Sequence, residues 1–501
     1  MNQAVLAKRS SNEPIESYKH NLISGEGYEN LVQSVARHPL KQFQKVGIHN
    51  AMLMLGQYQG CFIADDMGLG KTIEAIVLSE CMRVQNLLIV VEAKTLIQWQ
   101  AQYYKWTGKL LTTIKTKKDA AMLNSVLTPF VICSYDMLDA VTKANQKWDM
   151  VIYDEIQKLR SRQSKMSLAA RDIRDSSARW VVGLTGTLQW GYVRDLWNPI
   201  RVTFRYLFGT ADEFDFTYCG AFINEHGGKD NKGYKSSDGI DRSEELAIRL
   251  SYVSVRRTRV DVKAELPAFT RNVIRIPCTQ KATIALHAFL RKELPYMNAI
   301  MSTSSEKTEP VLELLETLTN AIIFTWTNAD VALLTALIMK SGRAVYSINK
   351  GVSKSERVAI IQRAATEKAT IVATIDSIGV GVDGLQHVSS NVIFHSLSHS
   401  PKLHLQAESR AFRMGQTNPV VITYFVMQDS ADELVISILE AKSNQDGASA
   451  TESDKTAFTG LKMDDAAMRQ VLADWVKNAT DEIEQGNSNS EGWSDNDDSE
   501  D

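Results

Sequence analysis

Short apolar runs recur along the first half of the chain and again along its second half. Between residues 40 and 200, five of them alternate with segments of helical composition: GCFIAD, NLLIVVE, PFVICSY, DMVIYDE and RWVVGLTG. The alternation returns after residue 320 in NAIIFTW, AVYSIN, ATIVATI, NVIFHS and VVITYFV. Runs that are apolar throughout are typical of parallel strands covered on both faces. The pattern therefore predicts an α/β fold with two doubly wound parallel sheets.

The pattern changes between the two blocks and again after the second. An aromatic stretch, a polar Gly-rich loop and the basic stretch VRRTRVDVK lie between the blocks, and the chain turns polar near residue 443. We expect a helical insertion between the blocks and no third sheet there. The predicted division is an N-terminal segment 1–38, a first lobe 39–205, a helical insertion and linker 206–310, a second lobe 311–442, and an acidic, largely disordered tail 443–501.

Composition excludes some classes of protein. The chain has 501 residues, more than one core supports, with 44% hydrophobic and 23% charged residues as in a globular protein. No apolar run reaches the length of a membrane span, and the N-terminus lacks the apolar core of a secretion signal. We therefore expect a cytoplasmic protein without membrane contact. Five scattered cysteines favour reduced thiols over disulfides or a zinc site.

Charge is unevenly distributed along the chain. The net charge is −3, but no Lys or Arg follows Lys477, while nine of the 59 acidic residues do. The body of the chain is therefore mildly basic, which is compatible with nucleic-acid binding. The acidic tail is either a solubilising segment or a competitor for phosphates in a basic groove.

The stretch FIADDMGLGKTIEA, residues 62–75, joins an apolar run to a helical one through a Gly-rich turn. Such a turn lets backbone N–H groups curl around an anion, and the helix N-terminus adds its positive end. Lys71 is placed to reach β and γ phosphates and Thr72 to hold Mg²⁺. The general phosphate-loop pattern has Gly where this chain has Asp65, so a turn with an incidental lysine stays open at this point.

Two carboxylates follow the run DMVIY about eighty residues later. Asp154 and Glu155 then lie at the carboxyl edge of the predicted sheet, where ligands bind in open α/β sheets. Asp154 is a candidate Mg²⁺ ligand, and Glu155 a candidate acceptor of the proton from an attacking water. Together with the Gly-rich turn, the pair favours an ATPase.

Two arginines near the end of the second block are spaced three apart. In QAESRAFRMGQ, Arg410 and Arg413 project from one face of a helix. They are either arginine fingers for a γ-phosphate or a salt-bridged surface. Spacing alone favours neither interpretation.

Taken together, these stretches resemble the Swi/Snf-type ATPases of helicase superfamily two, in order along roughly residues 39–440. The resemblance implies two RecA-like lobes with ATP and Mg²⁺ in the cleft between them. ADDMGLGKT is close to the family's own phosphate loop, which also carries Asp at the position of Asp65. LKQFQKVG resembles the segment that reads adenine, and ATIDSIGVGVDGLQ the Gly-rich coupling segment. QAESRAFRMGQ is nearly the family's finger motif, which favours the finger interpretation of Arg410 and Arg413.

The resemblance also implies roles for individual residues. Nucleotide contacts fall on a set from both lobes: Gln44, Asp66, Met67, Gly68, Leu69, Gly70, Lys71, Thr72, Gly381 and Asp383. Contacts to nucleic-acid phosphates are expected from Lys94, Thr95 and Ser134. Coupling of the nucleotide state to the contact between the lobes is expected from Gln157, Thr185 and Gln406.

Three features depart from the family pattern. Gln157 stands where the family has histidine, LTGT lacks the following proline, and the inter-lobe region is short. Coupling between nucleotide state and lobe contact is therefore expected to be tuned differently. The compact size favours a bacterial or viral protein.

The resemblance implies a monomeric ATPase that translocates on double-stranded DNA and remodels protein–DNA or branched DNA structures. Two other functions stay open. One is a strand-separating helicase acting on DNA, RNA or RNA–DNA hybrids. The other is an ATP-switched binding protein that displaces a roadblock such as a polymerase.

Overall fold

The computed structural model describes most of the chain between residues 26 and 436. The described residues are 26–123, 128–144, 146–186, 193–223, 229–231, 242–259, 261–291, 293, 296–378, 384–398, 401–413, 415–428, 430, 432–433 and 436. The predicted tail 443–501 and most of the predicted segment 1–38 lie outside them.

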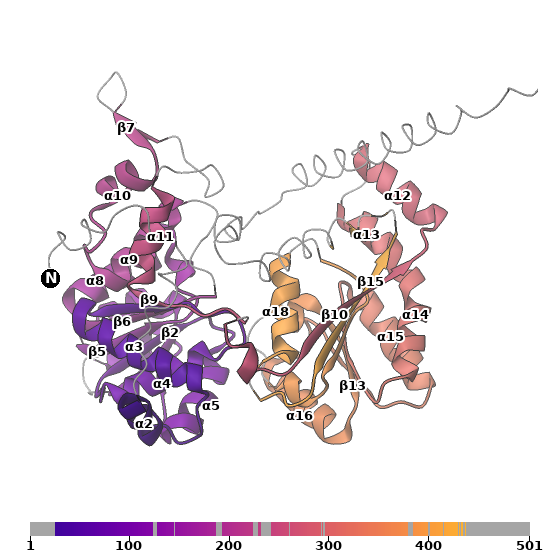
Figure 1. The fold of residues 1–501 in the computed structure, drawn as a ribbon, viewed down its shortest axis with the longest axis horizontal. Coiled ribbons are helices and arrows are strands. Elements are labelled where there is room, and N and C mark those ends of the chain that lie inside the picture. The colour runs from indigo at the N-terminus through magenta and orange to yellow at the C-terminus, as the bar shows by residue number, and fades with distance from the viewer. Residues whose placement is uncertain are drawn as a thin grey trace, which may run out of the picture.

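Seven parallel strands form the sheet of the first lobe (Figure 1). Their order is β3-β4-β2-β5-β6-β1-β9. The strands are β1 (Gly60–Ile63), β2 (Leu87–Val91), β3 (Thr112–Ile114), β4 (Phe130–Ser134), β5 (Trp148–Tyr153), β6 (Ala178–Leu184) and β9 (Ser254–Val255). Successive side chains of the buried strands point into two different cores, Leu88 and Val90 into one and Leu87 and Ile89 into the other.

Helices cover both faces of this sheet. The core of Leu87 and Ile89 is closed by α2 (Glu26–Val35), α3 (Gln42–Tyr58), α4 (Lys71–Cys81) and α5 (Leu96–Thr107). The core of Leu88 and Val90 is closed by α6 (Lys117–Met122), α7 (Leu138–Thr142), α8 (Lys165–Ser176), α9 (Trp197–Phe204), α10 (Ala211–Tyr218) and α11 (Ser243–Ser251). The continuous apolar strands are explained by this double cover.

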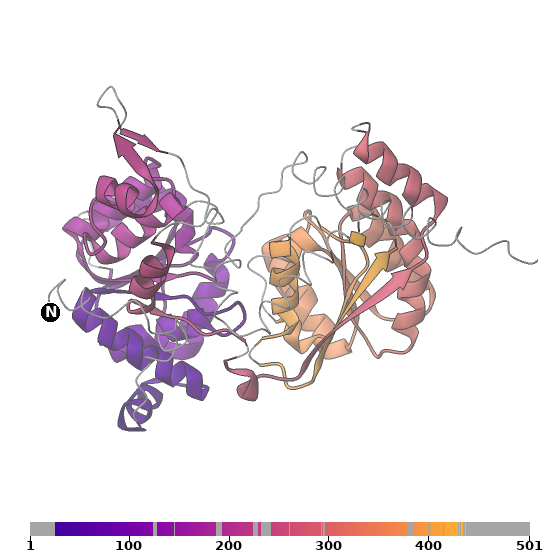
Figure 2. The same ribbon diagram turned by 45° about the horizontal axis from the view of Figure 1, so that its top comes forward.

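A second sheet of six parallel strands forms the other lobe, in the order β10-β15-β14-β11-β13-β12 (Figures 1 and 2). The strands are β10 (Phe269–Ile276), β11 (Ile322–Thr325), β12 (Val345–Ile348), β13 (Thr370–Thr374), β14 (Asn391–Phe394) and β15 (Val420–Met427). Its helices are α12 (Gln280–Leu290), α13 (Tyr296–Ser304), α14 (Thr308–Glu316), α15 (Asn328–Lys340), α16 (Lys354–Glu367), α17 (Ile375–Ile378) and α18 (Pro401–Ala411). The predicted fold class, two doubly wound parallel-sheet lobes, is confirmed.

The range 206–310, expected to be helical without a further sheet, also contains strands. In it, β9 completes the first sheet, β10 pairs with β15 over eight residues of the second, and β7 (Ala221–Ile223) pairs antiparallel with β8 (Lys229–Asn231). β10 is an edge strand, so its sequence FTRNVIRI alternates between half-buried and exposed residues and lacks the continuous apolar character of the inner strands. The domain boundaries stay predictions.

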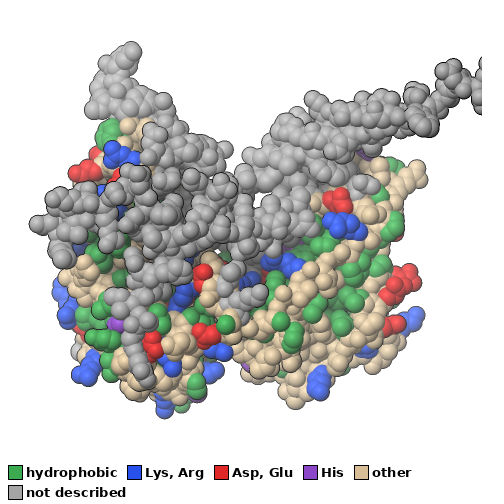
Figure 3. All heavy atoms as spheres, viewed as in Figure 1, with side chains coloured by type: hydrophobic (Ala, Val, Ile, Leu, Met, Phe, Trp, Pro, Cys, Tyr) green, Lys and Arg blue, Asp and Glu red, His purple; other side chains and the backbone are tan. Residues whose placement is uncertain are grey.

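The surface shows no segregation of charge on the face drawn in Figure 3. Where grey atoms do not cover this face, basic and acidic side chains are interspersed with hydrophobic ones over both lobes. Among the helices in the described part of the chain, none has both the length and the apolar character needed to cross a bilayer. The five cysteines are free in this structure, three of them buried and two partly buried.

Candidate active site between the two lobes

The Gly-rich turn connects β1 to α4, which begins at Lys71. Gly68 and Gly70 have φ angles of 90° and 97°, in the left-handed region that favours glycine. The Lys71 ammonium curls back over the turn and donates hydrogen bonds to the carbonyl oxygens of Asp65 (2.7 Å) and Asp66 (3.2 Å). A glycine turn, a helix N-terminus and a lysine thus meet at one point, which fits a phosphate group.

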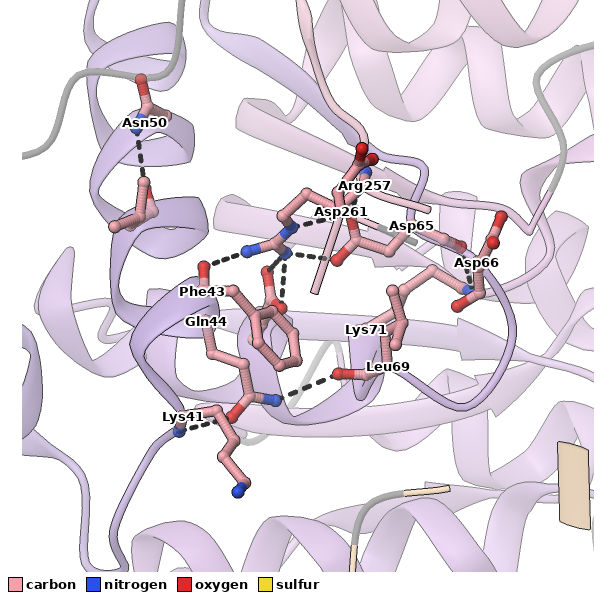
Figure 4. Close-up of polar contacts among 12 residues, drawn as sticks. Lys41, Phe43, Gln44, Asn50, Asp65, Asp66, Leu69, Lys71, Arg257 and Asp261 are labelled. Carbon is pink, nitrogen blue, oxygen red and sulfur yellow. Dashed lines mark hydrogen bonds and ion pairs between the residues drawn. The ribbon is translucent and has the colours of Figure 1, made fainter. Parts of the chain in front are cut away.

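Asp65, the residue that departs from the general phosphate-loop pattern, is the partner of a buried arginine. Its Oδ1 accepts hydrogen bonds from the backbone N–H (2.9 Å) and Nε (3.0 Å) of Arg257, which also forms an ion pair with Oδ2 (Figure 4). Arg257 Nη2 donates to both carboxylate oxygens of Glu74 at 2.6 Å, and Nη1 to the carbonyl of Phe43. Burial raises the pKa of Glu74, although Arg257 opposes this effect. Asp65 therefore anchors the turn to the segment between the lobes.

Further residues of that segment contact the turn and α3. The Arg259 backbone N–H donates to Asp66 Oδ2 (3.0 Å), and its side chain donates to the carbonyl of Met67. The Glu265 carboxylate accepts from the backbone N–H groups of Gln42 (2.8 Å) and Phe43 (3.1 Å) at the start of α3. The basic stretch that the sequence placed between the lobes is thus part of the phosphate-loop support.

Asp154 and Glu155 follow β5 directly. Asp154 Oδ2 accepts a hydrogen bond from the indole N–H of Trp99 (2.8 Å). Burial and the neighbouring Glu155 raise the pKa of Asp154 to about 7, while Trp99 and Lys71 act in the opposite direction. Glu155 has a φ of 53°, which is uncommon for a residue other than glycine, and its Oε2 accepts a hydrogen bond from the Gln157 amide. The strained backbone suits a functional position.

The Gly-rich turn, Lys71, Asp154 and Glu155 line a cavity of about 550 Å³ that is also lined by residues of the second lobe. The lining includes eleven of the residues predicted from the sequence: Met67, Gly68, Gly70, Lys71, Thr72, Thr95, Asp154, Glu155, Gln406, Arg410 and Arg413. Residues from both lobes therefore face the same space. Oxygen donors such as the Thr72 hydroxyl and Asp154 carboxylate are of the kind that binds Mg²⁺, and the described residues contain no cluster of three or more His, Cys, Asp or Glu suited to a metal.

Other predicted residues support the site without lining the cavity. Gln44 is fully buried, and its amide donates to the Leu69 carbonyl (3.2 Å) and accepts from the Lys41 N–H (3.2 Å) (Figure 4). Thr185 is also buried.

The candidate nucleic-acid residues differ in exposure. Lys94 is exposed and forms an ion pair with Glu92 (2.8 Å), whereas Thr95 and Ser134 are almost completely buried. Gly381 and Asp383 lie outside the described residues.

Several lining residues were not predicted from the sequence. Trp99 and Gln102 on α5 line the cavity, as do Gln386, the last residue of the coupling segment, and His387 after it. Arg257 supports the phosphate loop through Asp65. An acidic residue inside an apolar helical run, as Glu74 is in KTIEAIVLS, is the sequence signal that could have indicated a buried cation, because a buried carboxylate requires a partner.

Models of known protein families match both lobes of the chain. The family profile described as the SNF2-related domain matches residues 6–323, and the helicase conserved C-terminal domain matches residues 306–415. The chain belongs to the SNF2-related family.

Curated relatives of this SNF2-related chain are similar over most of its length. It is 25% identical to the bovine (Bos taurus) DNA annealing helicase and endonuclease ZRANB3, over 88% of this chain and 44% of that protein. It is also 25% identical to the Caenorhabditis elegans homologue of SWI/SNF-related matrix-associated actin-dependent regulator of chromatin subfamily A-like protein 1, over 88% of this chain and 66% of that protein. The chain spans less than half the length of the ZRANB3 relatives.

Among solved structures, a Sulfolobus solfataricus SWI2/SNF2 ATPase core in complex with double-stranded DNA aligns with a TM-score of 0.41 and 20% identity. The alignment covers 85% of this chain and 98% of that one.

Replacing Arg257 with Met tests the anchor of the turn. Arg257→Met leaves the buried carboxylates of Asp65 and Glu74 without their cation, so we expect the unfolding free energy of the first lobe to fall by roughly 3–5 kcal/mol. Denaturant unfolding measures it. The triple variant that adds Asp65→Asn and Glu74→Gln removes the stranded charges and should recover much of the loss. A single variant within about 1 kcal/mol of the unsubstituted protein would contradict the anchor.

The raised pKa of Asp154 predicts a pH-dependent stability without metal. Between its ordinary pKa of 3.8 and about 7, folded Asp154 keeps a proton that the unfolded chain loses, so stability falls as pH rises through this window. Asp154→Asn removes this loss. In metal-free buffer its melting temperature should exceed that of the unsubstituted protein by more at about pH 8 than at about pH 4. An equal difference at both pH values would show that Asp154 carries no such penalty.

Proposed function

We propose that the chain hydrolyses ATP in the cavity between its lobes and couples hydrolysis to translocation on double-stranded DNA. The carrying observation is that Lys71, Asp154 and Glu155 from one lobe line the same cavity as Arg410 and Arg413 from the other. This arrangement supports a reaction that proceeds only when the lobes meet, which is what a motor requires.

Each group has a role that its position supports. Lys71 and the amides of the turn bind the β and γ phosphates. Thr72 and Asp154 hold Mg²⁺, which when bound neutralises phosphate charge. Glu155, oriented by Gln157, accepts the proton of the attacking water.

The second lobe completes the site. Arg410 and Arg413 act as arginine fingers on the γ-phosphate. Gly381 and Asp383 belong to the proposed nucleotide contacts of this lobe. In the first lobe, Gln44 reads the adenine edge once its amide exchanges the bonds to Leu69 and Lys41.

DNA is the proposed polymer because the ZRANB3 relatives carry the name DNA annealing helicase. Lys94, Thr95 and Ser134 are the proposed phosphate contacts, so binding should be salt-sensitive and nearly sequence-blind. Helix α5 connects the proposed DNA contact to the proposed ATP site. Thr95 lies at the start of α5, and the indole N–H of Trp99, one turn later, donates a hydrogen bond to Asp154. Thr185 and Gln406 are the further proposed coupling residues.

The proposed physiological task is the remodelling of protein–DNA or branched DNA structures by a cytoplasmic monomer of bacterial or viral origin. A strand-separating helicase on DNA or RNA, and an ATP-switched protein that displaces a partner such as a polymerase, are the competing functions. Displacement of a third strand from a blunt triplex reports translocation, and release of one strand from a fork reports unwinding. We expect ATP-dependent triplex displacement without fork unwinding; fork unwinding alone would favour the helicase.

Glu155→Gln keeps the shape of the site and the neighbouring Asp154 but removes the proton acceptor. We expect the affinity for ATP to be retained and turnover to fall by roughly a hundredfold. Steady-state hydrolysis and equilibrium nucleotide binding measure the two quantities. Loss of binding in proportion to the loss of turnover would make Glu155 a structural residue.

Arg413→Ala should leave ATP bound to the first lobe while lowering turnover by about three orders of magnitude, as loss of an arginine finger does. Arg410→Ala should act in the same direction. Arg275→Ala, which removes an exposed arginine of β10 paired with Glu433, is the matched control and should hydrolyse ATP normally. Normal hydrolysis by both finger variants in the presence of DNA would exclude the finger assignment.

A further inference from the structure

Arg259 lies where the phosphate loop, the inter-lobe segment and the second lobe meet. Its Nε and Nη2 donate to the Met67 carbonyl of the loop at 3.3 and 3.1 Å. Its guanidinium carbon also lies 5.0 Å from the centre of the Phe412 ring, a cation–π distance. Phe412 follows α18 of the second lobe and directly precedes the proposed finger Arg413. One guanidinium therefore contacts both lobes beside the reacting groups.

The loop and the finger segment approach each other closely at the same place. A Cβ atom on Gly68 would lie 2.9 Å from the backbone oxygen of Phe412 and 3.4 Å from Cβ of Arg413. Only glycine permits this contact together with the φ of 90°. The contact between the lobes is thus built around the loop residues that Arg259 holds.

The two contacts of Arg259 are not equivalent. The nearby Arg257 forms ion pairs with Asp65 and Glu74. The backbone N–H of Arg259 donates a hydrogen bond to the Asp66 carboxylate. These bonds fix Arg259 to the first lobe. The Phe412 ring belongs to the second lobe, where it packs 4.6 Å from the ring of Phe269 on β10. Separation of the lobes would break the Phe412 contact and leave the Met67 contact intact.

We propose that Arg259 is a positioning residue, a docking platform for Phe412 that holds the Phe412–Arg413 segment against the phosphate loop. The cation–π contact favours the docked arrangement of the lobes, and the Met67 bonds tie this arrangement to the shape of the loop. The consequence for turnover rests on the proposed function, because Arg413 acts on the γ-phosphate only from the docked segment. The docking itself does not depend on hydrolysis.

Two variants remove the two sides of the contact. Arg259→Gln removes the cation and keeps an amide donor for the Met67 carbonyl, and Phe412→Leu removes the aromatic face and keeps apolar packing on Phe269. We expect each to lower turnover roughly tenfold, the size of one cation–π contact, with nucleotide affinity nearly unchanged. Because both remove the same contact, the double variant should be no slower than either single one. Arg259→Lys keeps the cation, so its turnover should be closer to that of the unsubstituted protein. Arg275→Gln is the control, and its turnover should be unchanged.

A distance measurement tests docking without hydrolysis. Spin labels at cysteines introduced for the exposed Lys118 and Thr366, with Cys81 and Cys278 changed to serine, report the separation of the lobes in nucleotide-free protein. Arg259→Gln and Phe412→Leu should both shift the distances toward longer values, and Arg275→Gln should not.

Two results would overturn the proposal. One is an unchanged distance distribution in Arg259→Gln, which would make Arg259 a support of the loop alone. The other is a double variant whose loss of turnover is the product of the two single losses, because the residues would then act independently. If the unsubstituted protein fails to hydrolyse ATP, the proposed function fails, and the distances still decide the docking.

Discussion

The guanidinium of Arg257, buried between Asp65 and Glu74, is the interaction on which the candidate active site depends. Two carboxylates in a water-free interior repel each other and are poorly solvated, so they require a cation between them. A Cβ atom on Gly47 would lie 2.5 Å from Arg257 Nη1, so glycine is what lets α3 approach this cation. The phosphate loop, α3, α4 and the inter-lobe segment are fixed relative to one another through this one side chain.

The ion pairs of Arg257 also determine how the two lobes contribute to the active site. Arg257 and Arg259 bind the inter-lobe segment to the phosphate loop. The chain that continues to β10 therefore begins beside the loop. The second lobe contributes Arg410 on α18 and Arg413 after it to the lining of the cavity. Neither lobe holds all the groups that the proposed reaction needs, so the movement of one lobe against the other is expected to control it.

Continuous apolar runs were sufficient to predict the inner strands, and the local glycine, carboxylate and arginine motifs predicted the charged groups Lys71, Asp154, Glu155, Arg410 and Arg413 of the cavity lining. Prediction from the sequence failed where the partner of a residue lies far away along the chain. Arg257 is 192 residues from Asp65, so no local pattern explained an aspartate in place of glycine; the family resemblance supplied it instead. β10 escaped detection because an edge strand is half-exposed and alternates in polarity. The buried amide of Gln44 shows the same limit, since its partners Leu69 and Lys41 are set by packing and not by a motif.

The rate of ATP hydrolysis with different polymers tests the proposed coupling most directly. It should be measured without polymer and with single-stranded DNA, double-stranded DNA and RNA, with Lys71→Ala as the inactive control. We predict slow hydrolysis without polymer and the largest stimulation by double-stranded DNA, falling as salt is raised. Hydrolysis that is equal under all four conditions, or that persists in Lys71→Ala, would contradict a DNA-driven motor.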